Sequence, residues 1–90
     1  MNQSYFDKMY RNILAGKVHN IKFTDLCDFV VDLGFRLARQ NGTSHKVFII
    51  EGSERILVLQ EDKSGCAKPY QVRQVRDAIK SLKIGGKDDK

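Results

Sequence analysis

Histidine and cysteine are the side chains of this 90-residue chain best suited to acid–base, nucleophilic or metal chemistry. There are two of each: His19, His45, Cys27 and Cys66. No pair of them has the short spacing of a zinc site or of a Cys-X-X-Cys redox motif, so we expect two reduced thiols, no metal site and no cofactor. His45 stands out because it follows the turn-forming segment Gly42-Thr-Ser44 and begins an apolar stretch.

The charge balance favours a polyanionic partner. The chain has 16 Lys and Arg against 11 Asp and Glu, a net charge of +5, and nucleic acid is the commonest polyanion that a small basic domain meets. The longest uncharged apolar run, Val47 to Ile50, is far shorter than the roughly 20 residues of a membrane span. Residues 1–5 hold no basic segment followed by an apolar core, so no secretion signal is indicated. We therefore expect a soluble, cytoplasmic protein with no membrane partner.

Three helices are predicted. The first, over residues 4–16 with Ser4 as its N-cap, has apolar side chains at helical spacing. The second begins with Thr24 as its N-cap and stops at Gly34. The third begins at Pro69, which suits the first position of a helix. Beside its apolar residues the third helix carries a basic stripe, composed of Arg73, Arg76, Lys80 and Lys83.

Between the second and third helices the apolar period changes to two, which predicts a three-stranded antiparallel sheet. The strands are expected over residues 35–40, 45–50 and 55–60. Gly52-Ser53 fits a two-residue type II′ turn, and residues 41–44 are interpreted as a four-residue loop. Without the first helix the order is α-β-β-β-α, an α+β topology shared with double-stranded-RNA-binding domains (dsRBD).

These loop lengths fix the faces of the sheet, with Gln40 and Gln60 opposite His45. The face expected to pack against the helices carries Phe35, Leu37, Phe48, Ile50, Leu57 and Leu59. The other face carries Arg36, Ala38, Gln40, His45, Val47, Ile49, Ile56, Val58 and Gln60.

The second of these faces should be polar if it meets water. Four of its residues instead form an apolar patch: Val47, Ile49, Ile56 and Val58. Such a patch predicts a partner interface. The first helix, a second copy of the chain in a homodimer, or a different protein could cover it.

Several segments resemble the HicA family of bacterial toxins. The most specific is Arg39-Gln-Asn-Gly42-Thr-Ser44-His45-Lys-Val-Phe48, which is similar to that family's Gly-Ser-His-His motif at the start of the second strand. Phe23-Thr-Asp-Leu, Leu33-Gly-Phe-Arg and Lys68-Pro69-Tyr70-Gln71-Val72 add to the resemblance. It covers about residues 21–84, which leaves residues 1–20 as an N-terminal helix and linker and residues 85–90 as a flexible tail.

HicA proteins have a dsRBD-like fold, cleave mRNA without a metal and are neutralised by the antitoxin HicB. The resemblance therefore implies a toxin with endoribonuclease activity, with His45 as its catalytic residue and with mRNA and a HicB-like antitoxin as partners. Two departures from the family pattern are visible. Thr43 lengthens the loop before Ser44, and Lys46 stands where the family has a second histidine.

The chemistry of RNA cleavage agrees with this interpretation. Attack by the RNA's own 2′-hydroxyl needs one proton removed and another delivered, and a histidine can do either near neutral pH. The group that handles the second proton stays open among Lys46, Tyr70 and water. His19, in the linker, is expected to be an ordinary exposed residue. The residues expected to contact RNA are Arg39, Gly42, Ser44, Lys46, Lys68 and Arg73.

Two other classes of function fit the same sequence. A non-catalytic dsRBD-like RNA-binding module, or a decayed toxin, would explain the Thr43 insertion and the missing second histidine. In a protein whose only role is association with other proteins, the basic charge would have no part in the function.

Overall fold

The computed structural model describes residues 1–41 and 45–84. Along the chain run α1 (Gln3–Leu14), α2 (Phe23–Leu33), β1 (Arg36–Asn41), β2 (His45–Ile49), β3 (Ile56–Leu59) and α3 (Pro69–Leu82). This order confirms the expected α+β fold, an α-β-β-β-α arrangement preceded by an extra helix. The tail expected over residues 85–90 lies outside the described residues.

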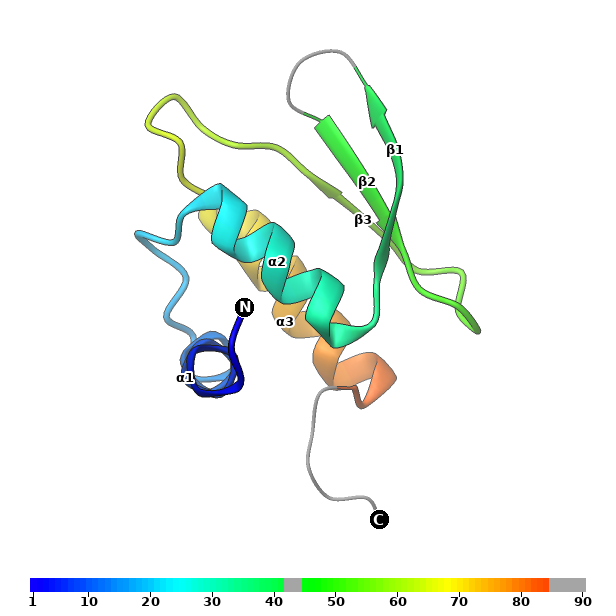
Figure 1. The fold of residues 1–90 in the computed structure, drawn as a ribbon, viewed down its shortest axis with the longest axis horizontal. Helices are drawn as coiled ribbons and strands as arrows, with labels where there is room; N and C mark the ends of the chain where they lie inside the picture. Colours follow the sequence, from blue (N-terminus) through cyan, green and yellow to red (C-terminus); the bar gives the residue numbers. More distant parts are fainter. Residues whose placement is uncertain (42–44, 85–90) are drawn as a thin grey trace.

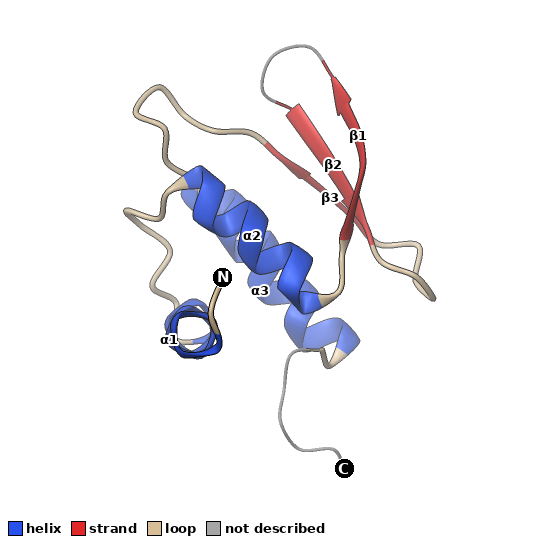
Figure 2. Ribbon diagram, in the orientation of Figure 1, coloured by secondary structure: helices blue, strands red, loops and turns tan. Residues whose placement is uncertain are grey.

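The sheet and the helices form layers (Figures 1 and 2). The sheet is antiparallel, with its strands in the order β1-β2-β3. α2 and α3 lie against one face of it, and α1 packs on these two helices on the side away from the sheet. We call the face turned away from α2 and α3 the outer face. The N-terminal helix does not cover the outer face, so that alternative for the apolar patch is wrong.

α2 and α3 form the middle layer of the core, with α1 on one side of them and the sheet on the other. The Phe29 ring is fully buried and stacks on the Phe6 ring of α1, with 4.9 Å between the ring centroids. From the sheet, Phe48, Leu57 and Leu59 reach the same core, as expected. The buried residues of α2 are Phe23, Leu26, Cys27, Phe29, Val30 and Leu33.

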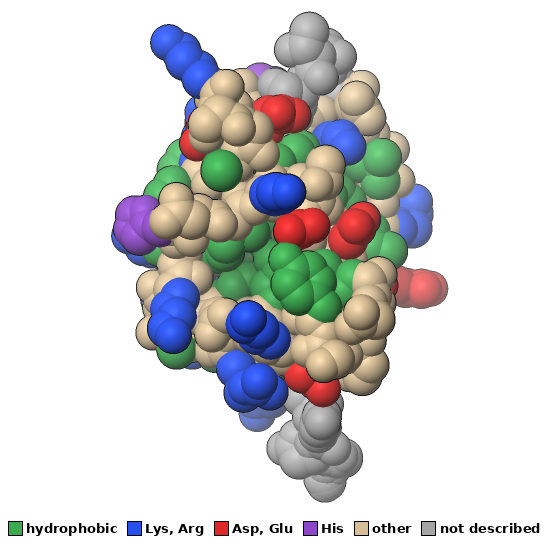
Figure 3. Space-filling view, turned by 60° about the vertical axis from the view of Figure 1, so that its left-hand side comes forward, with side chains coloured by type: hydrophobic (Ala, Val, Ile, Leu, Met, Phe, Trp, Pro, Cys, Tyr) green, Lys and Arg blue, Asp and Glu red, His purple; other side chains and the backbone are tan. Residues whose placement is uncertain are grey.

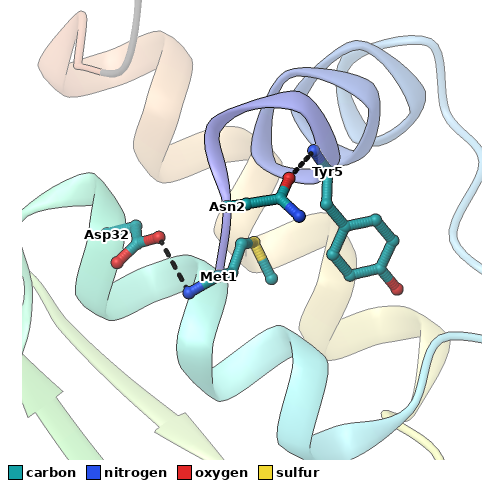
Figure 4. Close-up of polar contacts among 4 residues, drawn as sticks. All are labelled: Met1, Asn2, Tyr5 and Asp32. Atoms are coloured by element: carbon teal, nitrogen blue, oxygen red, sulfur yellow. Dashed lines mark hydrogen bonds and ion pairs between the residues drawn. The ribbon is translucent and has the colours of Figure 1, made fainter.

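The first helix begins earlier than expected. Its N-cap is Asn2 and not Ser4, and the Asn2 side-chain oxygen accepts a hydrogen bond of 2.8 Å from the Tyr5 backbone N–H (Figure 4). Beside this cap the Met1 amine forms an ion pair with Asp32 of α2, with 3.7 Å between nitrogen and oxygen. The Asn2 cap stabilises the first turn of the helix, and the ion pair links this turn to α2.

The second helix begins with Lys22 as its N-cap and not with Thr24, and no side chain caps it. A neighbouring loop supplies the acceptor instead, because the Phe23 N–H donates to the Gly65 carbonyl at 3.0 Å. Gly34, with a φ of 121°, ends the helix as expected. A tertiary contact has therefore replaced the local cap that the sequence predicted.

The pairing of β2 with β3 has the expected register. The pairs are Ile49–Ile56, Phe48–Leu57, Val47–Val58 and Lys46–Leu59. Because the ladder ends at the first of these pairs, a longer loop over residues 50–55 joins the strands. The two-residue turn expected at Gly52-Ser53 is therefore wrong, although the register that it implied is right.

The pairing of β1 with β2 changes register between Leu37 and Arg39, where Ala38 is an extra residue in β1. Such a β-bulge places two residues of one strand opposite one residue of its partner. Before the bulge the expected register holds, with the pairs Arg36–Ile49 and Leu37–Phe48. After the bulge the pairs are Arg39–Val47, Gln40–Lys46 and Asn41–His45.

The bulge makes several expectations wrong. Gln40 does not lie opposite His45, and Ala38 is not the ladder partner of Val47, because each β1 residue after the bulge has moved by one position. Gln40 is thereby moved to the helix side of the sheet and Arg39 to the outer face. Leu37, expected in the core, is 45% exposed because it lies on an edge strand.

The two cysteines are free thiols, as expected, and differ in their surroundings. Burial raises the pKa of the Cys27 thiol to about 11, although the nearby charge of Lys46 acts in the opposite direction. Because the thiolate is the reactive form, we expect iodoacetamide at about pH 8 to alkylate the half-buried Cys66 about 10²-fold faster than Cys27 in the folded protein. Mass spectrometry of the labelled chain measures both rates.

The control is the same reaction in concentrated urea, where the two thiols should react at similar rates. Equal rates in the folded protein would contradict the burial of Cys27.

The raised pKa of the Cys27 thiol also makes the stability of the protein depend on pH. Since the folded Cys27 thiol keeps its proton to about 11 and the unfolded one only to 9.0, stability falls as the pH rises through this interval.

Candidate functional site

His45 is the first residue of β2, and its side chain is exposed. Val47 and Ile49 share its face because side chains alternate along a strand. Phe48, between them, is buried in the core, so the His45 face is the outer face. Among the described residues none forms a hydrogen bond with the imidazole ring, which leaves both ring nitrogens open to a ligand.

Two arginines of β1 lie on the outer face beside these residues. Arg39 is paired with Val47, and Arg36 with Ile49. Both arginine side chains are exposed, and neither forms an ion pair with a carboxylate of the described residues. The outer face therefore presents an open imidazole and two open guanidinium groups along its β1–β2 side, an arrangement suited to a phosphate backbone.

Sequence reasoning assigned Arg36 to this face but did not single it out as a site residue. In a regular strand, residues three apart point to opposite faces, so Arg36 and Arg39 were not expected together. The bulge at Ala38 is what brings both to one face.

The β3 side of the outer face is apolar. Ile56 is 54% exposed and Val58 is 40% exposed, as expected for the apolar patch. Val47 is only 8% exposed because it lies in the central strand, between Arg39 and Val58. The accessible part of the apolar patch is thus carried by β3 and by the half-buried Ile49.

Lys46 lies on the opposite face of the sheet from His45. Its ammonium nitrogen is 5.7 Å from the centre of the Phe23 ring at the start of α2, a cation–π contact. Its charge also acts on the Cys27 thiol of the same helix. The Lys46 ammonium therefore does not lie on the His45 side of the sheet, so that Tyr70 and water remain of the three candidates for the second proton.

The start of α3 is fastened to the end of β3, which lies at the His45 end of the sheet. Gln71, only 3% exposed, accepts a hydrogen bond of 2.9 Å through Oε1 from the Gln60 N–H. Gln60 makes this bond in place of the ladder pair with His45 that was expected. Lys68, the half-buried N-cap of α3, and the exposed Arg73 consequently lie near this end of the domain.

The loop that leads to Lys68 is held by one carboxylate. Asp62 accepts hydrogen bonds from the hydroxyl and the N–H of Ser64, at 2.7 and 2.8 Å, and from the N–H of Cys66 at 2.9 Å. These bonds, with that of the Ser64 hydroxyl the strongest influence, lower the pKa of Asp62 below its ordinary value of 3.8. The loop is thus ordered up to the start of α3.

The other residues singled out from the sequence differ in exposure and in their partners. In the basic stripe, Arg73, Lys80 and Lys83 are exposed. Arg76 is instead paired with Asp77 at 3.4 Å, and its side chain is 28% exposed. Tyr70, in the first turn of α3, is 52% exposed. Gly42, Thr43 and Ser44 lie outside the described residues, and His19 is exposed in the linker as expected.

Within residues 1–41 and 45–84, no group of three or more His, Cys, Asp or Glu side chains is arranged to hold a metal ion. In the same part of the chain, no helix has the length and apolar character to cross a membrane.

Comparisons of this chain with family models, with curated proteins and with solved structures gave no match. The structure itself defines a small α+β domain whose sheet carries helices on one face and an open histidine with two arginines on the other.

Proposed function

We propose that this protein is an RNA-cleaving toxin of the HicA type, with His45 as its catalytic residue. The observation that carries the proposal is the outer face, where the exposed His45 at the start of β2 lies on the same side as Arg36 and Arg39. The α-β-β-β-α order and the likeness of the His45 segment to the family motif add support. The net charge of +5 suits mRNA as the substrate.

In the proposed reaction, as in the HicA family, no metal takes part. The His45 imidazole removes the proton of a ribose 2′-hydroxyl, and that oxygen attacks the neighbouring phosphorus while the bond to the 5′-oxygen breaks. The guanidinium of Arg39 stabilises the negative charge that grows on the phosphate oxygens. Because the Lys46 ammonium faces α2, the second proton reaches the leaving 5′-oxygen from Tyr70 or from water. The products are a 2′,3′-cyclic phosphate and a 5′-hydroxyl.

The apolar patch is the proposed docking surface for a HicB-like antitoxin. It adjoins His45 on the outer face, so a protein bound there would also cover the catalytic residue. Ile56 and Val58 supply exposed apolar area, and the arginines of β1 favour an acidic partner. A homodimer through the same face is the competing occupant. The toxin would act in the cytoplasm, where mRNA and antitoxin meet.

The test is induced expression of the wild-type chain and of His45→Ala in a bacterial host, with growth and total RNA followed together. Wild type is expected to arrest growth and to deplete RNA, and His45→Ala to do neither. With purified proteins, the variant should cleave RNA about 10²–10⁴-fold more slowly, the usual contribution of a general acid or base.

The matched control is His19→Ala, which removes the other histidine from an exposed linker position and should stay as toxic as wild type. A folded His45→Ala variant that cleaves RNA at the wild-type rate would refute the catalytic assignment. Circular dichroism of both variants verifies that they are folded.

The cations at the start of α3 favour a second candidate function, a non-catalytic RNA-binding module. Lys68 and Arg73 lie at the start of that helix, where free N–H groups add to their charge. In the growth experiment this function predicts harmless expression of wild type and of His45→Ala alike. It also predicts RNA binding that weakens steeply with salt and is unchanged by His45→Ala.

A further inference from the structure

A hollow of about 470 Å³ lies between α1, the linker over residues 15–22 and the first turn of α2. Its volume falls within the range of small-molecule sites, roughly 300–1,000 Å³. α2 and α3 lie between α1 and the sheet (Figure 1), so α1 is on the opposite side of these helices from the outer face. None of its lining residues takes part in the proposed cleavage.

Three lysines from three different segments line the hollow: Lys8 of α1, Lys17 of the linker and Lys22 at the N-cap of α2. All three are exposed, and none forms an ion pair with a carboxylate of the described residues. The carboxylate of the lining, Asp25, accepts a hydrogen bond of 2.8 Å from the Tyr5 hydroxyl. Three lysines against one carboxylate leave an excess of two positive charges for an anion.

The same side of the molecule is seen in Figure 3, where basic side chains gather over α1 and the linker at the lower left. Such a cluster of like charges is stabilised when an anion with several oxygens accepts hydrogen bonds from all of its members. A phosphate group has this character.

An aromatic ring and two amides also line the hollow. The Tyr5 ring is 44% exposed and extends away from α1 (Figure 4). Its hydrogen bond to Asp25 holds the hydroxyl and raises the pKa of Tyr5 above its ordinary value of 10.0. A partly exposed ring held in this way offers a face for stacking of a nucleobase. Asn12 and Asn20 add donors and acceptors for the edge of a base.

From this juxtaposition we infer that the hollow binds a nucleoside phosphate, with the phosphate at Lys8, Lys17 and Lys22 and the base against Tyr5. An inorganic anion would leave the ring and the amides unused, and an uncharged nucleoside would leave the lysines without a counter-charge. A free nucleotide and the phosphorylated end of an RNA strand share this chemistry.

The test measures binding of adenosine monophosphate (AMP) to the full chain by calorimetry, with amide shifts in NMR spectra locating the site. We expect shifts in α1 and the linker, and an affinity at least about tenfold above that for inorganic phosphate, because the base adds contacts. The triple variant Lys8→Gln, Lys17→Gln, Lys22→Gln should bind AMP at least about tenfold more weakly.

The matched control, Lys63→Gln, Lys80→Gln, Lys83→Gln, removes the same charge from exposed lysines outside the hollow and should bind AMP like wild type. Equal weakening in both triple variants would overturn the inference, as would inorganic phosphate binding as tightly as AMP. Amide shifts confined to the outer face would also overturn it.

Two Tyr5 variants test the role of the ring. Tyr5→Phe keeps the ring and should retain the preference for AMP over phosphate, whereas Tyr5→Ala should lose it. If Tyr5→Ala, folded by circular dichroism, keeps the full preference, the base does not lie on this ring and the inference fails in that part.

A short RNA with a 5′-phosphate separates the two sources of the ligand. If the amide shifts of α1 and the linker saturate at a lower concentration of this RNA than of AMP, the ligand is an RNA end, and if they saturate at a lower concentration of AMP, it is a free nucleotide. Both results support the site. The same titration of His45→Ala should give the wild-type affinity, so the outcome does not depend on the proposed cleavage.

Discussion

Replacing Phe29 with alanine is expected to lower the free energy of unfolding by about 3–5 kcal/mol. The side chain is 0% exposed, and its ring stacks on Phe6 of α1. The substitution removes the favourable free energy of burying the ring and leaves a cavity in the core, between α1 and the sheet. Small domains have a total stability of about 5–15 kcal/mol, so this single change takes a large share of it. Urea unfolding followed by circular dichroism measures the difference.

Val31→Ala is the control for this measurement because Val31 lies on the same helix and is 49% exposed. That change should alter stability by no more than about 0.5 kcal/mol. A loss below about 1 kcal/mol in Phe29→Ala would contradict the central position assigned to α2, since a buried phenylalanine cannot be removed so easily from a packed core.

Arg39→Ala is expected to slow RNA cleavage by about 10²-fold, the usual effect of removing one group that stabilises charge in the transition state. This prediction rests on the bulge at Ala38, which moves Arg39 to the outer face with His45. Gln40→Ala changes the next residue, which faces the helix side of the sheet opposite Lys46, and should leave the rate close to that of wild type. Steady-state cleavage of one RNA by the purified variants gives the comparison.

The two substitutions exchange their effects if the strand has no bulge. A slow Gln40→Ala and a normal Arg39→Ala would therefore contradict the register of β1 and the role of Arg39 together. Arg39→Lys separates charge from geometry, because lysine keeps the charge but not the two parallel donors of the guanidinium. It should recover part of the lost rate.

The elements that could be predicted from the sequence are those whose apolar period is regular. The stripe of α2 and the alternation of β2 and β3 predicted the helix and both strands, and the structure confirms them. The β2–β3 register, derived from the position of Gly52-Ser53, is also confirmed. The cap of α2 could not be predicted, because its acceptor is the carbonyl of Gly65, far along the chain. Local sequence at Thr24 offered a plausible cap that the fold does not use.

The candidate site was predictable only in part. His45 was found from its residue type and its motif, and the structure leaves it exposed at the start of β2. The neighbours of His45 depend on the register of β1, and a one-residue bulge leaves no trace in an alternating pattern. Arg39, a predicted RNA contact, lies on the His45 face only because of this bulge. Lys46, also a predicted RNA contact, faces α2 because side chains alternate along β2.

The position of α1 could not be predicted from its apolar stripe either. Its apolar stripe shows that one side is buried but not against which surface, since every amphipathic helix carries the same signal. The structure packs it on α2 and α3, and this creates the hollow with its three lysines. A site formed between two elements and a linker has no sequence motif of its own.

The packing of α1 on α3 has a consequence for synthesis. The Tyr10 hydroxyl of α1 donates a hydrogen bond of 3.3 Å to the Ile84 carbonyl just after α3, and α3 supplies Val72, Val75, Ala78 and Ile79 to the core. A nascent chain exposes α1, α2 and the sheet before α3 has left the ribosome, and until then their apolar faces have no complete partner. We therefore expect the His45 end of the sheet to take its final shape only after α3 has left the ribosome, so that the cleavage proposed for His45 would begin no earlier than that.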